Sequence, residues 1–219
     1  MPAVGTFDFV APVYSTLEWL TFGNALNEAR QAFLSRTIMA ERLLLIGEGD
    51  GRFLAGCLRG KAGGSITVID SSVTMLARAK ARASRIAHRT TLRFVHRDIR
   101  AFQQDEEKFD AIVTHFFLDL FRPESQRAVI REITTLADRD GFWVNVDYAP
   151  HLQTFCRRAI EWLQYRFDEL FCGVEADRHY EPKNLIAESG WVADEQLRFL
   201  NDAVDARLYL RRHALRGCS

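Results

Sequence analysis

The sequence predicts an α/β fold, a mostly parallel sheet with helices on both faces, on the basis of three observations. Apolar runs of strand length alternate with longer amphipathic segments, as in proteins whose parallel strands are buried on both faces. Gly47, Gly49 and Gly51 directly follow one such apolar run. The next run ends in Asp70, and the carboxyl ends of the strands are where open α/β sheets bind ligands. A ligand site is therefore expected at that edge of the sheet.

Length and composition narrow the classes of protein. The chain has 219 residues, which suits one α/β domain and is short for two. Lys and Arg number 29, as do Asp and Glu, so no overall field favours nucleic acid or an anionic membrane surface. The four cysteines lack metal-binding spacing, which indicates reduced thiols and no metal site. With no signal peptide or membrane span evident, a soluble cytoplasmic protein is expected.

Residues 1–40 predict an N-terminal helical cap. Leu17, Leu20, Leu26 and Phe33 have helical spacing among scattered charges, and Gly23 marks a break between two helices.

Residues 43–76 predict one β-α-β unit. Leu43 to Ile46 is too short and too apolar for a surface helix, so a buried strand is expected there. The glycines that follow let the backbone turn tightly and approach a ligand, and a helix begins at Arg52. A second strand, Ser65 to Ile69, then brings Asp70 to its end, where a carboxylate can bind a ribose diol.

The rest of the chain continues this alternation. Residues 72–88 predict a helix whose cations have no aromatic residues between them to stack bases, so it is interpreted as a solvated crossover helix. Residues 152–171 predict an aromatic-rich lid over the substrate pocket, with core packing or a dimer face as the alternative. The other expected elements are a strand over 91–95, a strand with its exit loop over 109–120, a helix over 124–137, a turn at Asp140-Gly141, a strand over 142–147, a short helix ending at Gly190, and closing strands over 191–200 and 206–212.

The spacing of the glycines separates two nucleotide-binding families. The dinucleotide fingerprint is G-x-G-x-x-G, and Arg52 stands at its third glycine position. The chain has G-x-G-x-G instead, and Asp70 opens the segment D-S-S-V-T-M-L. It therefore resembles the class I S-adenosylmethionine-dependent methyltransferases, whose motifs read (D/E)-x-G-x-G-x-G and D-x-S-x-x-M-L. The chain departs from the first motif at Leu45, which stands where the family has an acid.

The resemblance covers nearly the whole chain and is specific over residues 43–119. It implies a Rossmann-like sheet of seven strands, with the last strand antiparallel between its neighbours. It also implies a single methyltransferase domain over 1–219. Within that domain we expect the cap at 1–40, the cofactor-binding core at 41–150, and the lid helix and closing strands at 151–219.

The resemblance implies S-adenosylmethionine as cofactor and S-adenosylhomocysteine as product. Asp70 would bind the ribose, and Asp98 would accept a hydrogen bond from the adenine amino group, which only donates. Glu48 would supply negative charge in place of the acid missing at Leu45, with backbone carbonyls as the alternative. The expected cofactor-binding residues are Gly47, Glu48, Gly49, Gly51, Asp70, Ser71, Met75, Asp98, Ile99 and Thr114.

The resemblance also implies where the methyl group is transferred. His115 follows the fourth strand and could be a general base, or it could bond a backbone carbonyl or line the pocket. The segment F-D-F-V-A-P-V-Y at 7–14 resembles small-molecule methyltransferases of the ubiquinone and menaquinone biosynthesis type. By that resemblance Tyr14, a second candidate base, and Phe22 would lie over the cofactor and substrate, with simple packing onto the sheet as the alternative. Phe116 and Tyr148 would join Phe22 in binding the substrate.

The expected reaction is methyl transfer from the sulfonium to an O, N or C atom of a small, aromatic or lipophilic acceptor. Thr114 to Phe117 lack the Asn or Asp before Pro-Pro-aromatic that nucleic-acid amino methyltransferases carry, which argues against nucleic-acid acceptors. Two alternatives stay open: a cofactor-binding protein of this fold without catalysis, and an NAD-dependent oxidoreductase. The protein is expected to be a monomer or a homodimer.

Overall fold

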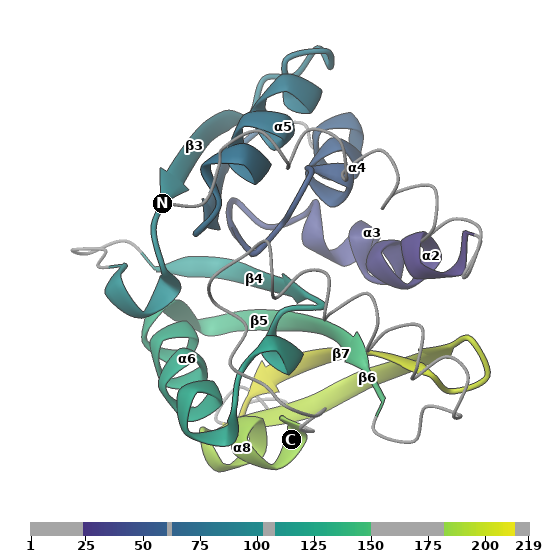
Figure 1. Ribbon diagram of the computed structural model, residues 1–219, viewed down its shortest axis with the longest axis vertical. Helices are drawn as coiled ribbons and strands as arrows, with labels where there is room; N and C mark the ends of the chain where they lie inside the picture. Colours follow the sequence, from purple (N-terminus) through teal and green to yellow (C-terminus); the bar gives the residue numbers. More distant parts are fainter. Residues whose placement is uncertain (1–23, 61–62, 103–107, 150–181, 213–219) are drawn as a thin grey trace, which may run out of the picture.

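A seven-stranded sheet forms the centre of the computed structural model, which describes residues 24–60, 63–102, 108–149 and 182–212 (Figure 1). The strands are β1 (Arg42–Ile46), β2 (Ser65–Asp70), β3 (Thr91–His96), β4 (Phe109–His115), β5 (Ala137–Tyr148), β6 (Trp191–Phe199) and β7 (Val204–Arg211). They lie in the order β3-β2-β1-β4-β5-β7-β6. The pairs among β1 to β5 are parallel, and β7 lies antiparallel between β5 and β6. The predicted fold class is confirmed, including the inserted antiparallel strand.

Helices cover both faces of this sheet (Figure 1). They are α2 (Ala25–Gln31), α3 (Leu34–Thr37), α4 (Arg52–Gly60), α5 (Val73–Ala83), the 3-10 turns η1 (Ile99–Ala101) and η2 (Leu118–Leu120), α6 (Pro123–Leu136) and α8 (Lys183–Glu188). Among the described residues, no helix has the length and apolar character needed to span a bilayer. Most of the predicted cap, and the whole of the predicted lid helix at 152–171, lie outside the described residues.

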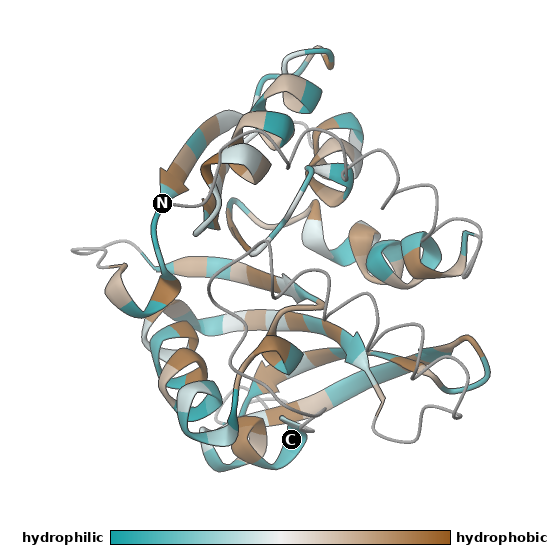
Figure 2. Ribbon diagram, viewed as in Figure 1, coloured by the Kyte–Doolittle hydropathy of each residue, from teal (hydrophilic) through white to brown (hydrophobic). Residues whose placement is uncertain are grey.

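The core divides into two layers because successive residues of a strand point to opposite faces. On β1, Leu43 and Leu45 pack with α2, α4 and α5, whereas Leu44 and Ile46 pack with α6 and α8. Figure 2 shows the hydrophobic residues gathered on the central strands and a long hydrophilic stretch on β6. That strand is at the edge of the sheet and is exposed over residues 193–198, where polar and charged side chains protect against edge-to-edge association.

Two elements differ by more than two residues from those predicted. The helix expected over 72–88 ends at Ala83, with Ser72 capping its start by accepting a bond from the Met75 amide at 3.2 Å. The turn expected at Asp140-Gly141 is wrong, because β5 begins at Ala137 and runs through both residues. A Cβ on Gly141 would lie 2.9 Å from the Phe109 carbonyl oxygen, where the β4–β5 register shifts. This glycine therefore permits a close backbone approach at an irregularity in the sheet.

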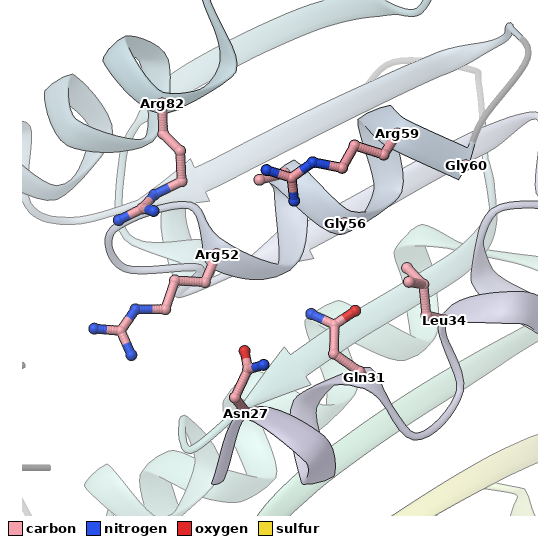
Figure 3. A pocket seen from close by; sticks show the side chains of 9 residues that line it. Asn27, Gln31, Leu34, Arg52, Gly56, Arg59, Gly60 and Arg82 are labelled. Atoms are coloured by element: carbon pink, nitrogen blue, oxygen red, sulfur yellow. The ribbon is translucent and has the colours of Figure 1, made fainter. Parts of the chain in front are cut away.

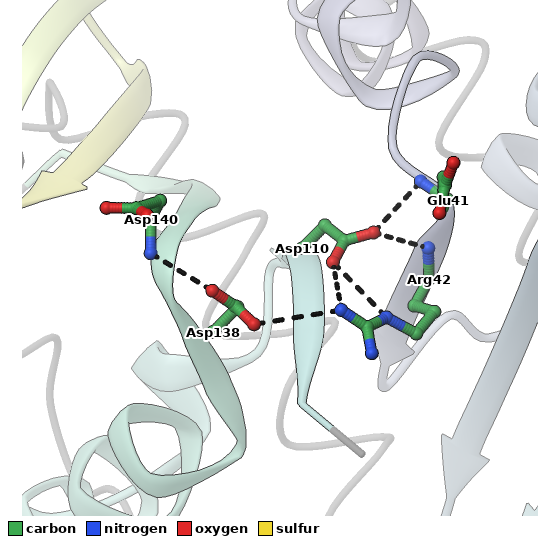
Figure 4. A network of polar contacts seen from close by, with 5 residues as sticks. All are labelled: Glu41, Arg42, Asp110, Asp138 and Asp140. Atoms are coloured by element: carbon green, nitrogen blue, oxygen red, sulfur yellow. Dashed lines mark hydrogen bonds and ion pairs between the residues drawn. The ribbon is translucent and has the colours of Figure 1, made fainter.

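An ion-pair network holds the amino ends of β1, β4 and β5 together (Figure 4). The Asp110 carboxylate accepts bonds from the amides of Glu41 (3.0 Å) and Arg42 (2.8 Å) and from the Arg42 guanidinium (2.8 Å). The same guanidinium lies 3.7 Å from Asp138, which also accepts from the Asp140 amide. The network fixes β1 relative to β4 and leaves the opposite, carboxyl edge of these strands free for a site.

Candidate active site

The glycine-rich turn after β1 needs its glycines for two physical reasons. Gly47, Gly49 and Gly51 have φ of 64°, 67° and 83°, in the left-handed region that L side chains rarely adopt. A Cβ on Gly51 would lie 2.7 Å from the Ala79 Cα, so this glycine lets α4 and α5 pack closely. A Cβ on Gly49 would have no atom within 4 Å among the described residues, so its backbone is accessible to a ligand.

Asp70 ties the end of β2 to this turn. One carboxylate oxygen accepts from the Ser72 amide at 2.8 Å and the other from the Gly49 amide at 3.3 Å. Burial raises the pKa of this carboxyl, while the two amides act in the opposite direction. Ser71 lies beside it, and its carbonyl oxygen is 3.0 Å from a ring nitrogen of His96. The sheet thus presents a carboxylate next to accessible glycine backbone.

Asp98 follows β3 and caps η1. It accepts from the Arg100 amide at 2.8 Å and pairs with the Arg100 guanidinium at 2.7 Å, and these bonds hold the pKa of Asp98 below its usual range. Ile99, another of the predicted cofactor-binding residues, has its side chain buried. The Asp98 carboxylate is thus a well-oriented hydrogen-bond acceptor at the carboxyl edge of the sheet. A ligand that donates a hydrogen bond to it would share this carboxylate with Arg100.

Glu48 points into the protein and not away from the turn. Its carboxylate accepts from the Leu54 amide at 2.9 Å, in the first turn of α4, where an acid also interacts favourably with the helix dipole. Burial raises the pKa of Glu48 to about 7, and the positive charge of Arg30 opposes that effect. Leu45, which stands in place of the expected acid, is 1% exposed in the core. The turn therefore has the Glu48 carboxyl beside it, which burial shifts toward its neutral form, and no acid at position 45.

Thr114 and His115 end β4 and point to opposite faces of the sheet. The Thr114 hydroxyl is completely buried, donating to Asn145 at 2.7 Å and accepting from the Trp143 indole at 2.9 Å. Thr114 was predicted to bind the cofactor, and its hydroxyl is already bonded within the protein. His115 packs edge-on against Phe53 with ring centroids 4.6 Å apart. Burial, and then the charge of Arg30, lowers its pKa to about 3, so the imidazole is neutral at neutral pH.

Phe116 and Tyr148, two of the predicted substrate-binding residues, meet at the carboxyl ends of β4 and β5. Their ring centroids are 4.7 Å apart, and the Arg30 guanidinium lies 4.9 Å from the Phe116 ring. Phe116 has φ of 50°, and its amide donates to the Val146 carbonyl at 2.6 Å. Backbone strain of this kind gathers at functional sites. The two other aromatic residues predicted at the site, Tyr14 and Phe22, lie outside the described residues.

Two polar residues near this edge, Arg30 and Asp119, were not among the predicted site residues, and a third polar residue, Asp147, lies next to Tyr148 near the end of β5. Arg30 approaches Glu48, His115 and Phe116 from α2, and nothing in its sequence context distinguishes it from other helix-surface arginines. Asp119 and Asp147 are buried carboxyls, 3% and 4% exposed. Burial raises the pKa of Asp119 to about 7, and burial together with the charge of Asp119 raises that of Asp147 well above its usual range. A sequence signal for Asp119 did exist, namely an acid within the apolar stretch F-F-L-D-L-F.

A groove of about 620 Å³ lies on the outer side of the glycine-rich turn, between α2, α3, α4 and α5 (Figure 3). Its polar lining consists of Asn27, Gln31, Arg52, Arg59 and Arg82. Arg52 and Arg82 both bind Asp50 within the turn, at 3.2 and 2.8 Å, so the cationic wall of the groove supports the turn from outside. Among the described residues, no group of three or more His, Cys, Asp or Glu could hold a metal ion.

Comparison with known families gives a match to a methyltransferase domain over residues 43–141. This segment contains the glycine-rich turn, Asp70, Asp98 and the end of β4. No curated protein sequence matches the chain significantly.

Solved structures share the fold over most of the chain. The N-methyltransferase NodS from Bradyrhizobium japonicum WM9, in complex with S-adenosylhomocysteine, is 20% identical with a TM-score of 0.65, covering 90% of this chain and 97% of that one. Magnesium protoporphyrin IX methyltransferase (ChlM) from Synechocystis PCC 6803, with the same bound product, is 15% identical with a TM-score of 0.62, covering 96% and 90%. The mitomycin 7-O-methyltransferase MmcR is 18% identical with a TM-score of 0.60, covering 86% and 54%. At these identities the likeness establishes the fold.

Proposed function

We propose that this chain moves a methyl group from S-adenosylmethionine to an O, N or C atom of a small molecule. The chain has the class I methyltransferase fold and matches the methyltransferase domain over residues 43–141. The observation that carries the proposal is the arrangement of Asp70. Its carboxylate lies at the carboxyl end of β2 and accepts the Gly49 amide, beside backbone with room for a ligand. Oxygen atoms that only accept hydrogen bonds suit a ribose diol at this position.

The proposed cofactor-binding residues fit the chemistry of that ligand. Asp98 offers an oriented acceptor for an adenine amino group, with the Ile99 backbone beside it. We propose that the Glu48 carboxyl next to the turn also accepts a hydrogen bond from an amino group of the ligand. The turn itself, with Ser71 and Met75 of the second motif, completes the proposed set. Thr114 contributes to this site through the packing of the β4 end, because its hydroxyl is bonded elsewhere.

Bound S-adenosylmethionine supplies a methyl group already activated on sulfur, so the residues of the chain mainly align the acceptor and exclude water. We propose that Phe116 and Tyr148 form one wall of the acceptor pocket, with Tyr14 and Phe22 as further candidates. Two aromatic rings in contact, one of them under a guanidinium, favour a flat or lipophilic acceptor. His115 is neutral and lies in apolar packing, which supports a role in lining the pocket over a role as a strong base.

Asp70→Asn tests the cofactor proposal directly. The variant keeps the shape, and its oxygen still accepts from the Ser72 amide, but an uncharged NH2 group, which only donates, replaces the oxygen that accepts from the Gly49 amide. Hydrogen bonds to charged groups are worth about 1.5–3 kcal/mol, so the Kd for S-adenosylhomocysteine should rise about 10- to 100-fold. Calorimetric titration measures this change. Asp138→Asn, at the amino edge of the sheet, is the matched control and should bind like the unaltered protein. Equal Kd values for the two variants would contradict the ribose assignment.

A second candidate function is cofactor binding without methyl transfer. Leu45, in place of the motif's acid, and the weakly basic His115 are the observations that favour it. Trideuteromethyl S-adenosylmethionine, incubated with the protein and a panel of phenols, quinone precursors and amines, separates the two functions. Mass-labelled acceptor supports transfer, and saturable binding with no labelled acceptor across the panel supports the second function.

We also propose a domain organisation, an acceptor class, a cellular location and an oligomeric state. The chain would form a single domain over residues 1–219, with its cap at 1–40 and its lid and closing strands at 151–219. Its acceptor would not be a nucleic acid, its location would be cytoplasmic, and it would act as a monomer or homodimer.

A further inference from the structure

Four buried side chains form a continuous chain of hydrogen bonds from the α6 and α8 layer to the end of β4. The Trp143 indole N–H donates to the Thr114 hydroxyl at 2.9 Å, and that hydroxyl donates to the Asn145 carbonyl at 2.7 Å. The Asn145 amide donates to one oxygen of Asp147 at 3.1 Å. The other oxygen of Asp147 accepts from the Phe117 backbone amide, also at 3.1 Å.

The direction of each hydrogen bond in this series, from donor to acceptor, follows from the groups that each side chain carries. The indole N–H can only donate, so the Thr114 hydroxyl accepts from it and passes its own proton to Asn145. The Asn145 amide is then left to donate, and Asp147 accepts at both oxygens. All four side chains are at most 5% exposed, so water cannot replace a lost partner. Removing one link therefore leaves a buried polar group unpaired, which costs more than a hydrogen bond at the surface.

The Asp147 end of this series of hydrogen bonds holds the Phe116-Phe117 turn, which faces the glycine-rich turn after β1. The Phe117 ring lies against Gly47, so closely that a Cβ on that glycine would be 2.5 Å from the Phe117 Cδ2. The preceding residue, Phe116, has φ of 50°, a conformation that costs energy for a bulky side chain. Only surrounding contacts keep such a turn in place, and Asp147 supplies one of them from β5.

We propose that Trp143, Thr114, Asn145 and Asp147 are positioning residues, which hold the Phe116-Phe117 turn against the glycine-rich loop and so shape the cofactor site. This inference rests on the proposed function for its effect on cofactor binding. Its structural part, the fixed Phe117 amide, stands without any ligand. Thr114 thus acts on the cofactor site through Asn145 and Asp147, and not by its own contact with the cofactor.

Thr114→Val is the decisive variant, because valine has the same shape and neither donates nor accepts. The first measurement is hydrogen exchange of the Phe117 amide by NMR in ligand-free protein, and the second is calorimetric binding of S-adenosylhomocysteine. We expect faster Phe117 exchange and a Kd raised about tenfold, the effect of one lost buried bond. Thr114→Ser, which keeps the hydroxyl, should restore both values.

Thr37→Val is the matched control, since Thr37 is also completely buried but donates to the carbonyl of Phe33, the residue before α3, away from the β4 end. It should leave Phe117 exchange and the Kd unchanged. If Thr114→Val does not fold, Trp143→Phe removes the first donor and should change both values in the same direction. Unchanged Phe117 exchange in the folded variant would overturn the inference. A native protein that binds no S-adenosylhomocysteine would instead overturn the proposed function, and the exchange measurement would still decide the positioning role.

Discussion

Single carboxylates at this site differ in behaviour because their surroundings differ. Asp98 lies at the surface beside Arg100, which favours its charged form. Glu48, Asp119 and Asp147 are withdrawn from water, which favours the neutral form. The motif position of Asp98 could be predicted from sequence, whereas the apolar residues around Asp119 only indicate burial, and its extent depends on how η2 packs against β5.

The pH dependence of stability follows from Asp119. Its pKa is raised from 3.8 to about 7 in the folded protein, so the folded state binds more protons than the unfolded state between those values. This contribution to stability is fully present below about pH 4 and is lost as the pH rises through 7. In Asp119→Asn, which mimics the neutral acid, the melting temperature should fall less between pH 5 and 8 than in the unaltered protein. The charged and titratable groups around Asp147, namely Asp205, Arg207 and Tyr209, stay unchanged in this comparison.

Asp138→Asn serves as the control for that measurement, since Asp138 is half-exposed at the other edge of the sheet. Its melting temperature should follow the same pH profile as that of the unaltered protein. Identical profiles for Asp119→Asn and the control would show that Asp119 is ionised throughout this range.

For Thr114, the sequence predicts the direction of the side chain but not its hydrogen-bond partners. Alternation along β4 requires that Thr114 and His115 point to opposite faces. Nothing in the sequence says that Trp143 and Asn145 of β5 complete the bonding of Thr114, because that depends on the parallel register, in which Thr114 lies opposite Asn145. The motif residues Gly47, Gly49 and Asp70, by contrast, are determined locally and lie where they were predicted.

At the scale of elements, the glycines determine which helices and strands can approach one another. Gly51 lies against Ala79 of α5, and Gly141 lies against the β4 backbone. In sequence, both a turn and a bulge call for glycine, so Asp140-Gly141 alone could not distinguish a turn from an irregular strand. The strands β1, β2 and β4 were predicted well because each is a short, mostly apolar run next to punctuating residues.

Gly51→Ala should separate α4 from α5. The added Cβ would be 2.7 Å from the Ala79 Cα, and the φ of 83° is itself unfavourable for alanine. Together these effects should lower the free energy of unfolding by about 2–4 kcal/mol, measured by urea denaturation. Gly190→Ala is the matched control, with φ of 88° and no atom within 4 Å of the added Cβ among the described residues. It should cost only the backbone penalty, about 1–2 kcal/mol. Equal losses in the two variants would mean that α4 and α5 adjust without strain.

At the scale of the whole molecule, the amino and carboxyl ends of the strands form two edges of the sheet that differ in structure and in proposed role. The amino edge is held by the Asp110 network, whereas the carboxyl edge carries the glycine-rich turn, Asp70 and Asp98. Sheet order and the methyltransferase domain match explain where a cofactor would bind. They do not identify the acceptor, because acceptor choice depends on a few side chains around the site that vary while the fold persists.

The most direct test of the proposed methyltransferase site is calorimetric titration of the protein with S-adenosylhomocysteine and, in parallel, with NAD. Saturable binding of S-adenosylhomocysteine at one site per chain, with no heat from NAD, is the expected result. Folded protein that gives no heat with S-adenosylhomocysteine, or that binds NAD instead, would contradict the proposal that this sheet edge is a methyltransferase site.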